Sequence, residues 1–426
     1  MKCWTGHRSL GFAALFVISL AKTGLAGEVL SPPANTRESG SAAQTRTLGE
    51  AVTGVTSTAP VDLSTAPTAT VTEKKPETIE PAFVRPLTRI EPGRNDANPQ
   101  WTPGGTFIAF ERSMGEKKEI NIMYADGTPV DTVYFQLSAD KDSKFFFPGL
   151  FEDVSYNAGI TWSPGRDRFV FMSNGGEGNY DLYLQELGRT AVRLTDHKEK
   201  DGQAHWSPVA DQIVFVSGRT GNGDVYIMDL STTSLTRVTR GGKAYLYPQW
   251  SPDGKRIAVM HGSNENHDIL VIAEPGRPSQ SQNALTTWPA DDLRPVWSPD
   301  GKKIAFYSNY NAANDPKLWS LVVIAADGSD PKEGDGLAAK VVATDVIPDI
   351  ETGPAWMPDS ARLVYVKNDR VEYNPIYIVD VAQRTNIGIR TDTRMNHDVA
   401  CSSDGTIAFR AQVNQWDQIY IMKLKQ

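Results

Sequence analysis

Short stretches in which apolar and polar residues alternate recur along the chain from about residue 80 onward. Examples are KRIAVM at 255–260 and KKIAFY at 302–307. Each is followed by a polar loop and then by a further apolar stretch, such as DILVIA at 268–273. A two-residue period over about 4–8 positions, bounded by Gly, Pro, Asn and Asp, predicts β-strands. The pattern therefore predicts an all-β chain built from short strands.

One phrase, Trp-Ser-Pro-Asp-Gly, marks a repeat that occurs seven times with some variation. A short apolar segment enters the Trp, and three further strand patterns follow before the next copy. The copies are 44 to 61 residues apart and stand at Trp101, Trp162, Trp206, Trp250, Trp297, Trp356 and Cys401. Four antiparallel strands in each unit of about 40–50 residues are typical of a β-propeller blade.

The two ends of the repeat region indicate how many blades the ring contains. The last copy stops after its third strand, while an isolated fourth-strand pattern, VRPLTRI at 84–90, precedes the first copy. Pairing of this segment with residues 419–424 would complete the last blade and leave no open sheet edge. We therefore predict a seven-bladed β-propeller of four-stranded antiparallel blades, closed by its N-terminal strand.

The repeated phrase is interpreted mainly as a structural unit. Its Pro and Gly occupy positions that a type I turn favours. Its Trp supplies a large apolar surface, worth roughly 4–6 kcal/mol at most when buried. Six of the ten tryptophans stand at this one position. A catalytic role for the repeated Ser or Asp is the alternative interpretation.

The N-terminal region differs from the repeats in composition. Basic residues precede an apolar run of 12 residues at 10–21, and the small residues Gly24 and Ala26 follow. This order predicts a secretory signal peptide at residues 1–26, with a buried helix as the alternative. Residues 27–80 include 32 Ser, Thr, Ala, Pro or Gly among 54, which predicts a disordered linker. The propeller is predicted to occupy residues 81–426.

Charge and cysteine content narrow the class of protein further. Cleavage near Ala26 would leave 40 Lys and Arg against 51 Asp and Glu, a net charge of −11. So acidic a chain argues against binding to nucleic acid, whose phosphates attract basic surfaces. Cys401 is the one cysteine after residue 26, so no internal disulfide is expected, although an exported protein could form one.

The repeats resemble the TolB-type propeller repeat, in which Trp-Ser-Pro-Asp-Gly-Lys leads into an apolar strand, an Asp-Ile-Tyr strand and a Leu-Thr strand. The segments PQWSPDGKRIAV at 248–259 and PVWSPDGKKIAF at 295–306 carry the resemblance. It implies a propeller fold and an exported protein of the bacterial cell envelope. It does not imply TolB itself, which has six blades and a small α/β domain before them.

Two enzyme families have similar repeats. Prolyl oligopeptidase relatives join them to an α/β-hydrolase domain, but this sequence has no Gly-x-Ser-x-Gly nucleophile motif. Oligogalacturonate lyases are seven-bladed and build a metal site from clustered His with a Gln, and no Gln-x-x-His-x-His cluster occurs here. Neither resemblance supplies catalytic residues.

A candidate binding rim is predicted at the position five before each repeat anchor, where the innermost strand of each blade would begin. Four of these seven residues are acidic and none is basic: Asp96, Asn157, Asp201, Tyr245, Asp292, Glu351 and Asn396. Solvated carboxylates around a channel mouth would favour a cation, or a partner that presents Lys or Arg. The alternative is that strand ends are simply polar.

The histidines after the signal peptide fall near the same predicted face: His197, His205, His261, His267 and His397. His261 and His267 flank a predicted hairpin loop, where they would either approach one another as metal ligands or remain exposed loop residues. A divalent cation at the channel mouth is considered, but no cofactor is assigned. No nucleophile and base stand at a defined spacing.

An aromatic insertion lies between the first two copies of the repeat. Its sequence, DKDSKFFFPGLFED, contains Phe145, Phe146, Phe147 and Phe151. Such a cluster would either anchor a protein interface or fold down and plug the channel.

These features predict an exported, non-catalytic β-propeller that acts as a binding platform in the bacterial cell envelope. Its partner would be a protein or a cationic ligand, and the protein itself would be a monomer without a transmembrane segment. The alternative function is that of a carbohydrate-active lyase or hydrolase using the acidic channel face.

Overall fold

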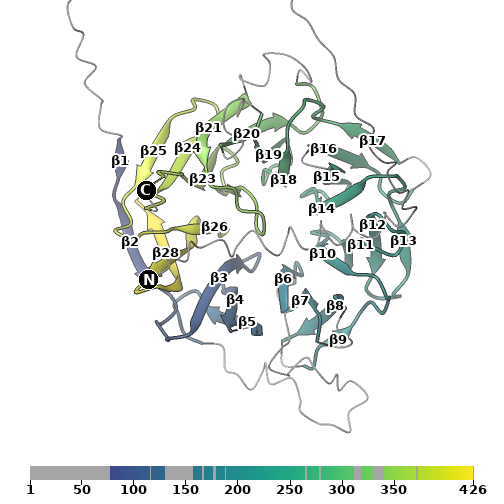
Figure 1. Ribbon diagram of the computed structural model, residues 1–426, viewed down its shortest axis with the longest axis horizontal. Coiled ribbons are helices and arrows are strands. Elements are labelled where there is room, and N and C mark those ends of the chain that lie inside the picture. Colours follow the sequence, from purple (N-terminus) through teal and green to yellow (C-terminus); the bar gives the residue numbers. More distant parts are fainter. Residues whose placement is uncertain are drawn as a thin grey trace, which may run out of the picture. The chain divides into compact units, whose positions relative to one another are not determined.

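Seven small antiparallel sheets form a ring around a central channel in the computed structural model (Figure 1). The structure describes residues 77–129 and 157–425, apart from short gaps at 116, 166, 176–178, 188, 264–265, 278–279, 311–317, 331–339 and 371–372. The predicted seven-bladed β-propeller is confirmed. Along the described chain, no helix has the length and apolar character that crossing a membrane would need.

Each blade runs from an innermost strand beside the channel to an outermost strand at the periphery (Figure 1). The first blade has three described strands, β3 (Arg94–Trp101), β4 (Phe107–Met114) and β5 (Lys117–Tyr124). The second consists of β6 (Asn157–Trp162), β7 (Arg168–Ser173), β8 (Asp181–Glu186) and β9 (Val192–Arg193). The third consists of β10 (Asp201–Trp206), β11 (Gln212–Ser217), β12 (Asp224–Asp229) and β13 (Leu235–Arg237).

The remaining blades repeat this order. The fourth consists of β14 (Ala244–Trp250), β15 (Arg256–Ser263), β16 (Asn266–Ala273) and β17 (Ser281–Ala284). The fifth consists of β18 (Asp292–Trp297), β19 (Lys303–Ser308), β20 (Trp319–Ala325) and β21 (Val341–Val346). The sixth consists of β22 (Ala355–Trp356), β23 (Arg362–Val366), β24 (Ile376–Asp380), β25 (Asn386–Ile389) and the added β1 (Thr78–Ile79). The seventh consists of β26 (His397–Cys401), β27 (Thr406–Val413), β28 (Trp416–Leu424) and β2 (Pro81–Pro86).

The ring closes through β2, which pairs antiparallel with β28. Val84 lies opposite Met422, and the Leu87 N–H donates to the Ile419 carbonyl at 2.8 Å. The predicted pairing of the N-terminal segment with residues 419–424 is thus confirmed for its first part, although the strand runs from Pro81 to Pro86 rather than from Val84 to Ile90. One boundary is corrected: β1 falls in the segment predicted as linker, yet it pairs in parallel with β25 and widens the sixth blade.

The core lies between neighbouring blades. The second strand of each blade is buried on both faces because a neighbouring sheet packs against each of them, as in β7, β11 and β19. This explains why these strands read as nearly continuous apolar runs. Repeat tryptophans bridge the boundaries: the indole of Trp297 donates to the Gln249 carbonyl, and that of Trp356 to the Val296 carbonyl, each at 3.2 Å.

The repeated Ser-Pro-Asp-Gly phrase forms the turn between the first two strands of a blade. In the fourth blade the buried Ser251 hydroxyl donates to the Asp253 carboxylate at 2.5 Å, and that carboxylate accepts the Lys255 N–H. Gly254 has a φ of 66°, and a Cβ there would lie 2.2 Å from Val209 of the preceding blade. The repeated Ser and Asp therefore hold the turn.

Candidate functional site

A β-bulge interrupts the innermost strand of six blades at one repeat position, three residues before the repeat anchor, and in the sixth blade the corresponding residue, Gly353, precedes β22. The register with the second strand breaks at the bulge, for example between Gly202 and His205 and between Leu246 and Gln249. The residue at this position has a φ between 51° and 80° in every blade: Asn98, Gly159, Gln203, Tyr247, Arg294, Gly353 and Asp398. A bulge bends the strand and re-aims a side chain, and left-handed backbone at non-glycine residues concentrates at binding sites. We call these seven residues the bulge ring.

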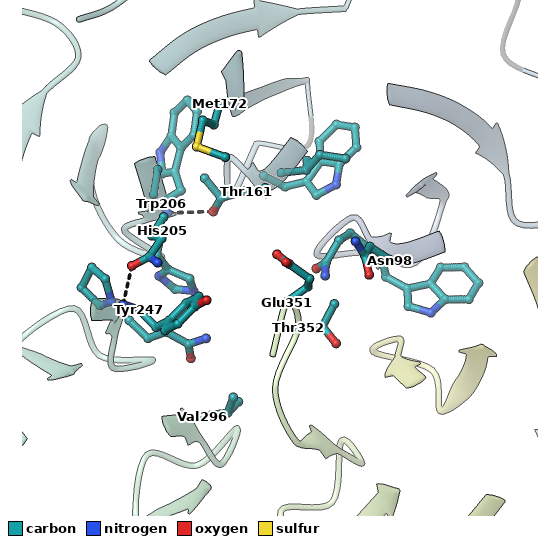
Figure 2. Close-up of a pocket in the computed structure, with 18 of the residues that line it drawn as sticks. Asn98, Thr161, Met172, His205, Trp206, Tyr247, Val296, Glu351 and Thr352 are labelled. Carbon is teal, nitrogen blue, oxygen red and sulfur yellow. Dashed lines mark hydrogen bonds between the residues drawn. The ribbon is translucent and has the colours of Figure 1, made fainter. Parts of the chain in front are cut away.

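Five members of the bulge ring line a cavity of about 520 Å³ in the channel: Asn98, Gly159, Gln203, Tyr247 and Arg294. Figure 2 shows Glu351 reaching into the open centre beside Asn98, across the cavity from Tyr247. A cavity of this size is in the range that small ligands occupy, roughly 300–1,000 Å³. Its wall combines tryptophan faces and prolines with a few fixed polar groups.

Glu351 is held in the cavity by a turn that precedes β22. The Asp349 carboxylate accepts the N–H groups of Glu351 and Thr352 at 3.0 and 2.9 Å, and also accepts the Thr352 hydroxyl. The Glu351 carboxylate itself makes no hydrogen bond or ion pair with any residue that the structure describes. Burial, followed by the nearby Glu111 charge, raises the pKa of Glu351 to about 7.

The Glu111 carboxylate, in contrast, is bound by other residues of the protein. Its carboxylate accepts hydrogen bonds from Lys118 at 2.7 Å, from the Asn98 amide at 2.8 Å and from the Gly159 N–H at 3.1 Å. It thereby ties the bulges of the first and second blades together. The charge of Glu111 is therefore balanced by Lys118, whereas the Glu351 carboxylate has no such ion pair among the described residues.

Arg294 supplies a positive charge to the same cavity. Its guanidinium lies over the Tyr247 ring, 4.4 Å from the centroid, and its Nε donates to the Ile350 carbonyl at 2.8 Å. These two contacts fix the orientation of the planar group. Its terminal nitrogens have no partner among the described residues.

His205 contributes a neutral donor. Its Nδ1 accepts the Trp250 N–H at 3.2 Å, as the Thr161 hydroxyl accepts the Trp206 N–H one blade earlier (Figure 2). Burial and the nearby Arg294 charge lower the pKa of His205 to about 4. The imidazole is therefore neutral at pH 7, with its proton on Nε2. The sequence predicts this histidine near the face that carries the candidate rim. The structure places it in the wall of the cavity.

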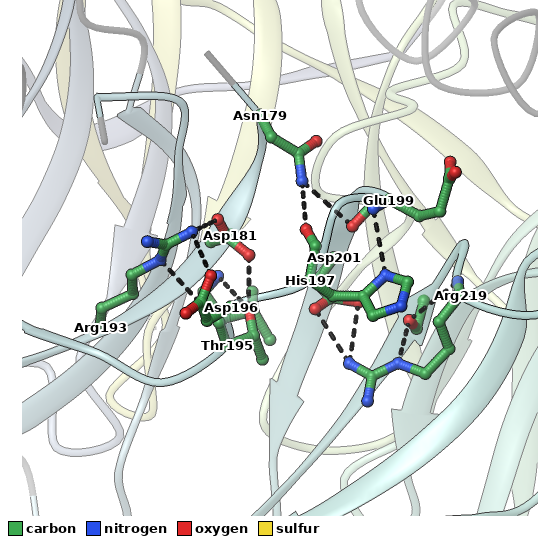
Figure 3. Close-up of polar contacts among 11 residues, drawn as sticks. Asn179, Asp181, Arg193, Thr195, Asp196, His197, Glu199, Asp201 and Arg219 are labelled. Atoms are coloured by element: carbon green, nitrogen blue, oxygen red, sulfur yellow. Dashed lines mark hydrogen bonds and ion pairs between the residues drawn. The ribbon is translucent and has the colours of Figure 1, made fainter. Parts of the chain in front are cut away.

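The aspartates of the predicted acidic rim were expected to be exposed to solvent, and this expectation is wrong because all three are buried. Asp96 and Asp201 are buried at the strand ends, where Asp96 pairs with Arg112 at 2.6 Å and Asp201 with Arg219 at 3.0 Å. Figure 3 shows Asp201 and Arg219 beside a second buried pair, Asp181 and Arg193, at the boundary of the second and third blades. Buried carboxylates in such pairs hold the fold together and are not available to a ligand.

The other predicted rim residues divide among several roles. Tyr245 is buried against His261, with ring centroids 4.4 Å apart, and Asn396 is buried and donates to the Asn374 carbonyl at 2.9 Å. Asn157 begins β6. Of the seven, Glu351 lines the cavity, and it does so from a turn rather than a strand.

Asp292 is the exception among the buried aspartates. It is fully buried, and neither carboxylate oxygen has a hydrogen-bond partner within the described chain. Ser308, Trp288 and Thr286 lie close enough to lower its pKa, but burial outweighs them and raises that pKa to about 7. Asp292 faces Ser308 as Asp201 faces Ser217, and Tyr310 stands where the third blade has Arg219.

The candidate metal ligands do not converge. His267 pairs through Nδ1 with Asp291 at 2.5 Å, whereas His261 packs against Tyr245. Within the described residues, no group of three or more His, Cys, Asp or Glu side chains is placed to hold a metal ion. No cofactor is assigned, and the divalent cation considered at the channel mouth is not tested by the structure.

The aromatic insertion, Phe145, Phe146, Phe147 and Phe151, lies outside the described residues. The bulge ring itself was missed by sequence reasoning. Its signal is that four of the seven positions are Gly, Asn or Asp, the residues that adopt left-handed backbone most readily.

A closed ring of seven blades around a polar channel defines a β-propeller protein. Residues 152–332 match the family described as the TolB beta propeller domain.

Several solved structures are similar to this chain, and those with a TM-score above 0.5 share its fold. TolB from Acinetobacter baumannii is 18% identical over 72% of this chain and 66% of its own, just under two thirds of its length, with a TM-score of 0.46. An oligogalacturonate lyase in complex with manganese is 13% identical over 83% of this chain and 96% of its own, with a TM-score of 0.59. A puromycin-hydrolyzing peptidase of Mycobacterium tuberculosis is 10% identical over 82% and 55%, with a TM-score of 0.56.

Proposed function

We propose that this protein is an exported, non-catalytic binding platform of the bacterial cell envelope, and that its channel cavity receives the partner. The observation that carries the proposal is the cavity wall. There the Arg294 guanidinium is oriented by the Tyr247 ring and the Ile350 carbonyl while its terminal nitrogens lack a partner among the described residues, and the Glu351 carboxylate extends unpaired from a backbone that Asp349 fixes. Fixed polar groups in a concave, partly apolar wall are typical of binding sites. The N-terminal pattern and the TolB-type repeats support the export of the protein.

Two polar groups of the wall, His205 and Glu111, are held in place rather than activated for catalysis. His205 accepts a backbone N–H and is neutral, and Glu111 forms an ion pair with Lys118 and accepts two further hydrogen bonds, from Asn98 and Gly159. Neither arrangement provides a general base beside a nucleophile. The second candidate function, a carbohydrate-active enzyme, is retained as an outcome of the test because propellers of similar fold include a lyase.

Site-specific photo-crosslinking tests the proposal. A photoreactive phenylalanine replaces Tyr247 in the cavity wall, and the control places it at Lys255, in an exposed turn between two strands. In cells or envelope extract, the position-247 protein should capture one reproducible partner that the position-255 protein does not. That partner, purified, should then bind the wild-type protein directly.

Two results would overturn the proposal. Identical capture from both positions would mean that the cavity is not the site. Release of product from a polysaccharide, with or without added divalent metal, would assign the protein to an enzyme class instead.

A further inference from the structure

Two opposite charges share one cavity wall without pairing with each other. The Glu351 carboxylate and the Arg294 guanidinium both line the cavity, and each influences its surroundings electrostatically: Arg294 lowers the pKa of Glu351. They nevertheless form no ion pair within 4.0 Å, and neither terminal group has another partner in the described chain. Since nearby opposite charges gain by pairing, their separation must be enforced by the backbone and by packing.

Specific contacts keep the Glu351 and Arg294 charges apart. Arg294 is held by the Ile350 carbonyl and the Tyr247 ring, and Glu351 is held by the turn that Asp349 organises. Both groups are therefore positioned before a ligand arrives, which reduces the entropy lost on binding. A preformed acceptor and a preformed donor at a fixed separation select a ligand with two opposite charges.

The groups around them fit a peptide. The Asn98 NH2 donates to Glu111 and the Gln203 amide oxygen accepts the Tyr247 N–H, each at 2.8 Å, which leaves the Asn98 amide oxygen and the Gln203 NH2 for a ligand beside the Nε2–H of His205. Amide and imidazole groups of this kind pair with peptide carbonyl and N–H groups. A neutral sugar would leave the Glu351 and Arg294 charges unmatched, and a sugar acid would match Arg294 alone.

We propose that the cavity binds a short zwitterionic peptide, with its ammonium group against Glu351 and its carboxylate against Arg294. This inference rests on the proposed function and names the chemistry of the ligand. The bidentate geometry of a guanidinium suits a carboxylate, and charge-assisted hydrogen bonds of this type are roughly twice as strong as neutral ones.

Oligoglycines provide the probe, because they vary the separation of the two charges without adding side chains. Binding of diglycine, triglycine and tetraglycine is measured by calorimetry at pH 8 and low salt. The best of the three is then compared with its N-acetylated and its C-amidated form. Each capped form should bind about tenfold more weakly than the zwitterion.

Variants assign each end of the peptide. Glu351→Gln should abolish the effect of N-acetylation and preserve that of amidation, and Arg294→Gln should do the reverse. Arg294→Lys keeps the charge and should keep the sensitivity to amidation. Arg256→Gln is the matched control, because Arg256 also lies over an aromatic ring, that of Trp297, but does not line the cavity.

Three outcomes would overturn the inference. Capping either end leaves the affinity unchanged, the two variants fail to show opposite sensitivities, or no oligoglycine binds at all. Equal binding of galacturonate to the wild-type protein and to Glu351→Gln would also overturn it. Crosslinking from position 247 tests the proposed function independently of the peptide measurements. If a partner is captured there but no oligoglycine binds, only the proposed class of ligand is refuted.

Discussion

At the scale of the residue, position within the repeat does not decide what an aspartate does; its neighbours do. Asp201 and Asp292 begin equivalent strands and are equally buried. Asp201 forms an ion pair with Arg219. Asp292 lies in a blade where Tyr310 stands at the position of that arginine. The same side chain is therefore a paired charge in one blade and an isolated carboxyl in another.

Substitution of these two aspartates by asparagine should have opposite effects. Asp201→Asn leaves Arg219 without its charge partner and should lower the free energy of unfolding by about 3 kcal/mol. Asp292→Asn should raise stability at pH 8. The pKa of Asp292 rises on folding from 3.8 to about 7, so the wild-type protein loses stability as the pH increases between those values.

Denaturant unfolding at pH 5 and pH 8 checks both changes. The advantage of Asp292→Asn should shrink at pH 5, where the wild-type carboxyl is protonated. A loss of stability from Asp292→Asn at pH 8 similar to that from Asp201→Asn would contradict the distinction between the two sites.

Glu351 should make both stability and binding depend on pH. Its pKa is raised from 4.5 to about 7, so the fold favours the protonated form and stability should fall as the pH rises through this range. An ammonium ligand needs the ionised form and should bind more tightly at pH 8 than at pH 6. Glu351→Gln should remove this increase, which calorimetry at the two pH values would reveal; an unchanged pH profile in the variant would place the titrating group elsewhere.

At the scale of the element, the alternating pattern predicted the strands well because burial of the blades imposes it. It also predicted that an N-terminal strand completes the last blade. It could not predict β1, since Thr78 and Ile79 lie in a stretch rich in Thr and Pro and form a strand of only two residues. Nor could it predict the bulges, because one additional residue in a strand leaves the two-residue period almost unchanged over so short a length.

Three truncations separate the contributions of β1 and β2. Removal of residues 27–76 should leave the melting temperature unchanged, because no strand that the structure describes includes them. Removal of 27–80 deletes β1 and should cost little, since only two residues pair with β25. Removal of 27–90 deletes β2 and exposes the edge of β28, and should destabilise the protein severely. Similar melting temperatures for the last two variants would show that the ring does not depend on its closing strand.

At the scale of the whole molecule, the interblade tryptophans couple the seven blades into one unit. Trp297 packs at the boundary of the fourth and fifth blades and donates to the Gln249 carbonyl across it. Trp297→Ala should lower the midpoint of one cooperative unfolding transition, at a cost of about 3–5 kcal/mol. Two separate transitions, recorded by calorimetry and tryptophan fluorescence, would show instead that the blades unfold independently.

The fold was predictable from the sequence to the number of blades, whereas the candidate site was not. The repeated residues correspond to structural elements that the blades share, such as the Trp250 anchor and the turn at Gly254. A site depends on what differs between blades, and those differences lie at bulge positions such as Arg294 and on a turn at Glu351. Which side chains meet across the channel depends on seven backbones at once, and no single strand pattern contains that information.

The bulge ring also has a consequence for how such a protein changes over generations. Its seven positions share one backbone conformation, and five of them line the cavity, so an exchanged side chain there changes the cavity wall directly. Gly159 is a vacant place among them: its φ of 68° suits asparagine, and a Cβ there would meet no atom within 4 Å. A scaffold with interchangeable places around one opening can acquire a new preference by single substitutions, and the same places are where a protein engineer would begin.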